Sequence, residues 1–311
     1  MSTAALTVVL QEPPSLARLY LNAAATAAAH RLRKRPAATR VPEAVHELPA
    51  LTVDLEHLTS FQRLLHATVR DELPSAYVHT LAFPVSMSVM TRDDFPLPLL
   101  GLVHLENSVE HHAAIPFTLP LTVRAHAENL AGHRAGTTVD MVAEVSDSVT
   151  RELLWRGVST YLAKGVFFPG LDKPGTGGRN GERAREPFVP PTPTALWRLG
   201  QETGRDYAGV SGDFNPIHLS SLSARALGMK TSLAHGMYSV ARVLAESGHD
   251  SDAGTRWHVG FEAPVYLPAT VAVSLQDAQD PGGEWTGTAF QAWNGKSARR
   301  HFHGRIEPLG R

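Results

Sequence analysis

The sequence predicts an α+β protein in which one unit, a mainly apolar helix followed by several strands, occurs twice. Its 311 residues are enough for two domains of ordinary size. Two separated pairs of segments match at the same offset of 152 residues: 80–85 resembles 232–237, and the pattern Glu-x5-Pro-x-Thr begins at both Glu110 and Glu262. Successive strands with turns between them form antiparallel sheet, and a helix packed on one face completes an α+β unit.

Apolar periodicity locates the helices and strands of both copies. The helix is clearest in the second copy, where Met237, Val240 and Leu244 lie on one stripe and Gly248 is suited to end it. A short N-terminal helix is expected after Ser15, which can act as its N-cap. Strands are expected at 119–127, 139–145 and 157–162 in the first copy, and at 271–275, 286–293 and 300–306 in the second.

A stretch rich in turn residues separates the two copies. Residues 168–194 hold six prolines and five glycines, a composition that opposes any regular helix or strand. The chain therefore divides into an N-terminal helix and extension at 1–45, a first copy at 46–167, this linker, and a second copy at 195–311.

Composition and charge exclude several classes of protein. The 29 Lys and Arg residues balance 30 Asp and Glu residues, and the net charge of -1 argues against a nucleic-acid binder. The absence of cysteine excludes disulfides, thiolate metal sites and a cysteine nucleophile. No run of 18 apolar residues occurs and no export signal is evident at the N-terminus, so we expect a cytoplasmic protein without a membrane span.

The segment 207–218 contains the densest group of residues able to do chemistry. Asp213, Asn215 and His218 lie within six residues of one another, next to Gly212. A carboxylate and an imidazole that face one point can polarise water and transfer a proton, and the amide of Asn215 can orient either group or the water.

The sequence also allows other interpretations of this segment. Asp213 and Asn215 can instead bond their own backbone in a turn, with His218 capping the following helix. A calcium loop fits less well, because Pro216 and Ile217 interrupt the spacing of oxygen ligands. A zinc site is not expected, because no second histidine follows His218 at i+4 and cysteine is absent.

A second segment, Ala234-His235-Gly236-Met237, opens the long apolar helix of the second copy. The first N–H groups of a helix have no partner within the helix, so the backbone of Gly236 can bind an oxyanion. A glycine also lets a ligand carbonyl approach closely. The alternative is a plain helix start, with glycine used for tight packing.

Together the two segments resemble the MaoC-like (R)-specific enoyl-thioester hydratases. The carrying motif reads Tyr-x-x-x-Ser-Gly-Asp-x-Asn-Pro-Ile-His, followed by Ala-His-Gly-Met. The first copy, with Leu-Pro-x-x-Tyr, Leu-Ala-Phe-Pro and Asp-Phe-Pro between residues 73 and 96, is similar to actinobacterial 3-hydroxyacyl-thioester dehydratases. The resemblance implies a double hotdog, in which two long helices are each wrapped by antiparallel sheet.

The resemblance also implies roles for individual residues. Asp213 and His218 would be the catalytic pair, Asn215 the asparagine of the motif, and Gly236 the N–H donor to the thioester carbonyl. Candidates for contact with the substrate are Ser211, Gly212 and His235 in the second copy, with Leu81 and Phe83 of the first enclosing the acyl chain.

The first copy is expected to be catalytically inert. At the 152-residue offset, Asp213 falls on Phe61 and Gly236 falls on Pro84, which has no N–H to donate. His66 does fall opposite His218, but it has neither an acid nor an N–H donor beside it.

The activity implied is the reversible hydration of trans-2-enoyl thioesters to (R)-3-hydroxyacyl thioesters in fatty-acid metabolism. Coenzyme A or an acyl carrier protein would carry the acyl group, and no metal or redox cofactor is expected. A hotdog acyl-thioesterase and a non-catalytic acyl-thioester-binding subunit are the alternatives. Two hotdogs in one chain already mimic the common hotdog dimer, and a homodimer of the chain is left open.

Overall fold

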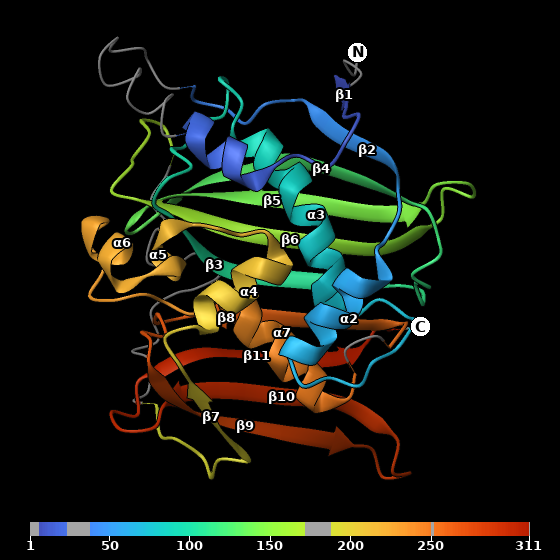
Figure 1. Ribbon diagram of the computed structural model, residues 1–311, viewed down its shortest axis with the longest axis vertical. Coiled ribbons are helices and arrows are strands. Elements are labelled where there is room, and N and C mark those ends of the chain that lie inside the picture. The colour runs from blue at the N-terminus through green and yellow to red at the C-terminus, as the bar shows by residue number, and fades with distance from the viewer. Residues whose placement is uncertain (1–5, 24–37, 172–187, 250–251, 311) are drawn as a thin grey trace. The chain divides into compact units, whose positions relative to one another are not determined.

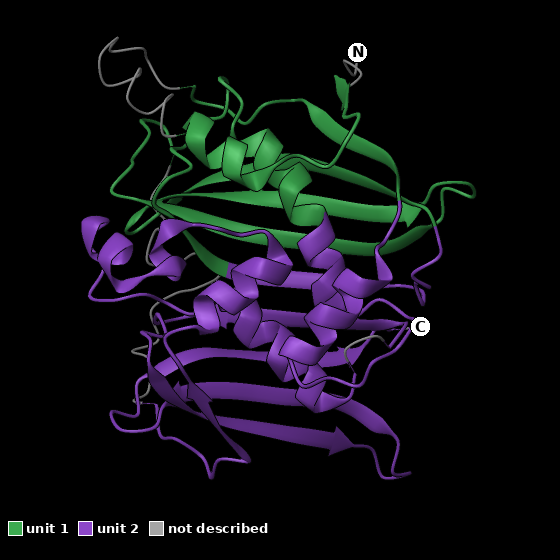
Figure 2. Cartoon of the chain, in the orientation of Figure 1, with its two compact units in different colours: residues 1–51, 82–105, 120–186 green, residues 52–81, 106–119, 187–311 purple. Residues whose placement is uncertain are grey.

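A computed structural model describes residues 6–23, 38–171, 188–249 and 252–310 (Figure 1). Contacts divide the chain into two compact units, drawn in different colours in Figure 2. The first unit comprises residues 1–51, 82–105 and 120–186, and the second comprises 52–81, 106–119 and 187–311. The units thus interleave along the sequence.

The order of the elements repeats along the chain. Each repeat runs strand, helices, then four strands. After a short strand β1 (Thr7–Val9), the first repeat contains β2 (Val45–Leu51), α2 (Leu55–Leu64), α3 (Ser75–Met90), β3 (Leu102–His111), β4 (Leu121–His133), β5 (Gly136–Asp147) and β6 (Leu153–Lys164). The second contains β7 (Ala195–Leu199), α4 (Thr203–Ser211), α5 (Pro216–Leu219), α6 (Ser221–Ala226), α7 (Gly236–Ser247), β8 (Thr255–Phe261), β9 (Ala269–Gln279), β10 (Trp285–Asn294) and β11 (Arg300–Pro308).

The order of the strands in space repeats as well. In the first unit the strands lie in the order β1-β2-β4-β5-β6, and in the second β8-β11-β10-β9-β7. Apart from the parallel pair β1–β2, the pairs between these neighbours are antiparallel. In the second unit, residues 106–111 of β3 also pair with β8. The predicted α+β double hotdog is therefore confirmed, with the same strand order used twice.

Alternating burial explains why these segments form half-buried strands. In β4 and β5 of the first unit, inward residues such as Val123 and Val145 are fully buried. In the second unit, Trp257 of β8 and Phe302 of β11 are buried in the same way, together with Val240 and other apolar residues of α7. The apolar stripe of α7 therefore packs into the core of the second unit. All six predicted strands of the two copies overlap observed ones.

The end of α7 and the start of α3 can be compared with their predicted positions. α7 ends at Gly248, which has the left-handed φ of 79° expected of a terminating glycine. The prediction that Pro84 occupies the position equivalent to Gly236, made from the 152-residue offset, is wrong. Pro84 lies inside α3, well after its start at Ser75, whereas Gly236 is the first residue of α7. A fixed offset fails here because the helices of the two repeats begin at different points.

The ends of the chain and the linker are described only in part. Residues 16–23 are helical, so the helix predicted after Ser15 begins where expected, and its continuation lies outside the described residues. Of the predicted linker, residues 172–187 also lie outside them. Within the described part of the chain, no helix is long and apolar enough to cross a membrane.

Candidate active site

The loop between α4 and α5 carries Asp213 and is fixed by hydrogen bonds at each residue. α4 ends at Gly212, whose φ of 71° lies in the left-handed region that glycine adopts readily. The Ser211 hydroxyl accepts the N–H of Asp213 at 3.2 Å. One carboxylate oxygen of Asp213 in turn accepts the N–H of Asn215 at 3.2 Å. The loop therefore holds the Asp213 carboxylate in a defined position.

Asn215 has a local structural role in this arrangement. Its side-chain oxygen accepts the N–H of Ile217 at 3.4 Å and caps α5. The turn reading is thus confirmed in that both Asp213 and Asn215 bond their own backbone. Its second part is wrong, because the helix after His218 is capped by Ser220. His218 is therefore available for another role.

His218 is held as a neutral base. Its Nδ1 lies 3.0 Å from the carbonyl oxygen of Leu233. A carbonyl only accepts hydrogen bonds, so Nδ1 carries the proton and Nε2 keeps its lone pair. Burial lowers the pKa of His218, although the Asp213 carboxylate and the Leu233 carbonyl act in the opposite direction. The unprotonated Nε2 can accept a proton from a bound water near neutral pH.

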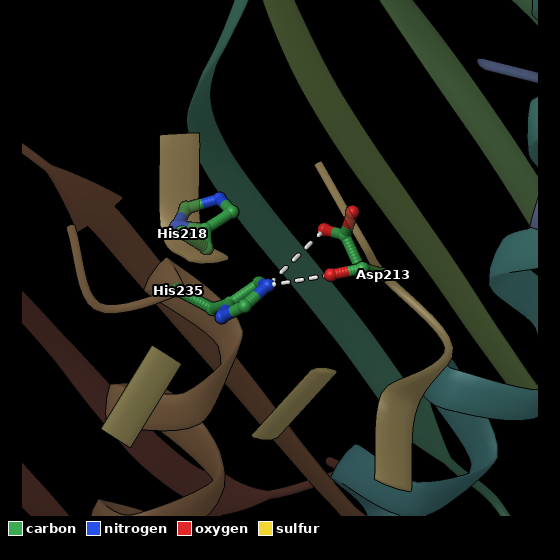
Figure 3. A group of neighbouring side chains, drawn as sticks. All are labelled: Asp213, His218 and His235. Carbon is green, nitrogen blue, oxygen red and sulfur yellow. Dashed lines mark hydrogen bonds and ion pairs between the residues drawn. The ribbon is translucent and has the colours of Figure 1, made fainter. Parts of the chain in front are cut away.

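His235 connects the loop that carries Asp213 to the start of α7 (Figure 3). Its Nε2 donates to the backbone carbonyl of Asp213 at 2.9 Å and lies 3.7 Å from a carboxylate oxygen of the same residue. Its ring stacks on that of His218, with centroids 3.7 Å apart and planes 24° apart. Burial, with His218 as the next cause, lowers the pKa of His235 to about 3. His235 is therefore neutral, and its contact with the carboxylate is polar rather than an ion pair.

Gly236 is the first residue of α7 and is exposed. Its N–H has no carbonyl within the helix to bond, and the side chain of the N-cap residue His235 makes no capping bond. A Cβ at position 236 would come within 2.9 Å of the Phe261 ring. The close approach to Phe261 confirms the tight packing expected of this glycine. Its place at the first position of α7 is the one that the oxyanion-binding role requires, and that role stays a prediction.

The three polar side chains also have the composition of a metal site. Donor atoms of Asp213, His218 and His235 all lie within 4.8 Å of one another. The fold brings His235, which is 17 residues further along the chain, against His218, so the lack of a histidine at i+4 does not exclude a zinc site. One nitrogen of each ring is engaged by a backbone carbonyl, so each ring has a single nitrogen left to act as a metal ligand or as a base.

Several polar groups around this site were not assigned to it from the sequence. The ring of Tyr207 is buried 5.0 Å from that of His235, and its hydroxyl bonds the Thr80 side chain. His79 of α3 and Asn107 of β3 form a buried polar pair with 3.4 Å between nitrogens. His79, Thr80 and Asn107 come from the first repeat, where nothing in the local sequence distinguishes them from core residues.

The predicted contacts with the acyl chain lie on α3. Leu81 is the last α3 residue of the second unit, and Phe83 belongs to the first unit. Both side chains are half-buried. His66, the predicted inert histidine, is exposed just after α2.

The fold and the Asp–His site together define a class, and the comparisons with known proteins agree. Residues 182–288 match the family model described as MaoC like domain. The chain belongs to the MaoC-like family of hydratases and dehydratases. It is 33% identical over 258 residues to 3-hydroxyacyl-thioester dehydratase X of Mycobacterium tuberculosis, a match that covers 83% of this chain and 88% of the relative.

Solved structures show the same relationship. The crystal structure of HtdX from Mycobacterium tuberculosis superposes with a TM-score of 0.70 at 29% identity, covering 85% of this chain and 100% of that one. A MaoC-like dehydratase from Phytophthora capsici superposes with a TM-score of 0.65 at 17% identity, covering 85% and 94% of the two chains. The second likeness concerns the fold alone.

Proposed function

We propose that the protein catalyses the reversible hydration of trans-2-enoyl thioesters to (R)-3-hydroxyacyl thioesters in fatty-acid metabolism. The observation that carries this proposal is the placement of Asp213 beside His218, the neutral base, in a family of hydratases and dehydratases. The name of the Mycobacterium tuberculosis relative, a 3-hydroxyacyl-thioester dehydratase, supports the substrate class.

In the proposed mechanism, each step of the addition of water is assigned to a group of the site. The thioester carbonyl withdraws electrons from the double bond and makes C3 electrophilic. A water held by the Asp213 carboxylate and by Nε2 of His218 attacks C3 as its proton passes to the base. Negative charge develops on the thioester oxygen, where the N–H of Gly236 meets it. The proton taken from the water is returned to C2 by the Asp213–His218 pair, which completes the net addition of water and regenerates the base; the reverse sequence dehydrates the 3-hydroxyacyl thioester.

We further propose that the acyl group arrives on coenzyme A or on an acyl carrier protein. The enzyme would work in the cytoplasm, either as the single chain or as a homodimer. Asp213 and His218 are the proposed catalytic residues, and Ser211, Gly212 and His235 shape the loop that the substrate meets. Leu81 and Phe83 of α3 are the proposed contacts of the acyl chain.

No metal or redox cofactor is needed in this mechanism, because the thioester itself activates the double bond. Dialysis of the protein against a strong chelator is therefore expected to leave the hydration rate unchanged, measured before and after treatment. A loss of activity that added Zn²⁺ restores would show instead that Asp213, His218 and His235 hold a metal ion.

One assay tests the proposed activity against its alternatives. The protein is incubated with a short trans-2-enoyl-CoA while the enoyl absorbance and free thiol are followed together. Hydration is expected to consume the enoyl signal without releasing thiol. Release of thiol would identify a thioesterase, and the absence of both changes would identify a binding subunit; either result contradicts the proposal.

A further inference from the structure

His79 is a buried histidine of the second unit that the mechanism above does not use. It lies on α3, where its side chain is almost completely buried. Its Nδ1 is 3.4 Å from the amide nitrogen of Asn107. That nitrogen only donates hydrogen bonds, so Nδ1 of His79 accepts and the ring carries its proton on Nε2. Burial lowers the pKa of His79 to about 4, which keeps the ring neutral at pH 7.

Asn107 connects this histidine to the start of α7. Its side chain is fully buried, and its amide nitrogen also donates to the sulfur of Met237 at 3.7 Å. A thioether sulfur has no hydrogen to donate, so the contact with Met237 supports the assignment of this atom as the NH₂ group. Met237 directly follows Gly236, so the pair formed by His79 and Asn107 lies against the first turn of α7.

A second contact ties the same turn of α3 to the catalytic loop. Thr80, the residue after His79, bonds the hydroxyl of Tyr207, and the Tyr207 ring packs 5.0 Å from that of His235. His235 in turn holds the backbone of Asp213. The Asp213 carboxylate also acts electrostatically on both side chains: it opposes the burial that lowers the pKa of His79 and adds to the burial that raises the pKa of Tyr207. His79 is thus linked through Asn107 to the helix that begins with Gly236, and its neighbour Thr80 is linked through Tyr207 and His235 to the loop that carries Asp213.

We infer that His79 is a positioning residue of the proposed hydration, which donates through its Nε2–H to the Asp213 carboxylate, directly or through the attacking water. Asn107 fixes the tautomer in which this proton is available. A neutral donor orients the carboxylate toward the water without cancelling its charge, as a cation at this position would do. The inference rests on the proposed function and adds to it a group from the first repeat.

The experiment compares two amides at position 79. A Gln side chain places an NH₂ donor near the position of Nε2, whereas an Asn side chain places it near Nδ1. His79→Asn is therefore expected to lower kcat for enoyl-CoA hydration by about tenfold to a hundredfold, the cost of one hydrogen bond to a charged group, with KM little changed. His79→Gln is expected to restore most of kcat. His258→Asn is the matched control, because His258 is exposed and its Nδ1 lies 2.8 Å from the hydroxyl of Ser108, which has no part in the proposed mechanism.

The outcomes separate the two hypotheses. Melting temperatures of both His79 variants, measured alongside, establish that the Asn and Gln proteins are equally folded. Equal kcat values for these variants, or a change confined to KM, would overturn the role of His79 while leaving hydration intact. A wild-type protein that does not hydrate enoyl-CoA would overturn the proposed function, and the role of His79 with it.

Discussion

Asp213→Asn is expected to lower kcat for enoyl-CoA hydration by about a hundredfold to ten-thousandfold, the usual range for loss of a general acid or base group. The substitution keeps the size of the side chain and an oxygen that can still accept the N–H of Asn215, which lies 3.2 Å away in the native loop. The change therefore removes the charge that holds and polarises the water while preserving the loop. Steady-state rates on a short enoyl-CoA measure the effect.

The control for this variant is Asp206→Asn, which removes an exposed carboxylate from the first turn of α4 in the same unit. Its kcat should match that of the unmodified protein. The melting temperatures of both variants should remain close to the original. Full hydratase activity in a folded Asp213→Asn protein would disprove the mechanism.

Gly236→Pro is expected to lower kcat by about a hundredfold to a thousandfold, the cost of losing one oxyanion donor. Proline is well tolerated at the first position of a helix, because the N–H it lacks has no intrahelical partner. The preceding residue, His235, already has φ -65° and ψ 139°, the extended conformation that a following proline requires. The substitution thus removes the donor with little cost to the helix, and kcat reports the loss.

Gly236→Ala is the matched control for this change. Both variants add a Cβ that meets the Phe261 ring, at 2.9 Å in the native packing, but only alanine keeps the N–H. We expect the alanine variant to retain much more of kcat than the proline variant. Equal losses in the two would assign the effect to steric contact with Phe261 and would contradict the donor role of Gly236.

The sequence predicted the strands well, because alternation follows directly from a sheet with one buried face. Val123 and Val145 are fully buried at positions where the alternation requires apolar residues. The motif of the second repeat likewise predicted that Asp213 and His218 lie together, and their donor atoms are within 4.8 Å of each other. Local turn chemistry fixes Asp213, and the helix start fixes Gly236, so both depend on residues nearby in the chain.

What the sequence did not predict depends on contacts between distant segments. His235 stacks on His218 only because α7 returns to the loop, and no spacing rule anticipates that stacking. His79 lies in an apolar helix, where a single histidine resembles an ordinary core residue until its contact with Asn107 is seen. The wrong pairing of Pro84 with Gly236 has a related cause, since a linear offset does not account for helices of different extent.

The way in which the second unit is assembled has a consequence for how this protein can be divided. The unit that contains Asp213 and His218 also draws residues 52–81 and 106–119 from the first half of the chain. A gene encoding only residues 195–311 would keep the whole recognisable motif yet omit α2, the first turns of α3 and the strand segment that pairs with β8. The sequence repeat therefore does not coincide with the compact unit, and a single continuous fragment that contains all of the second unit must span residues 52–311.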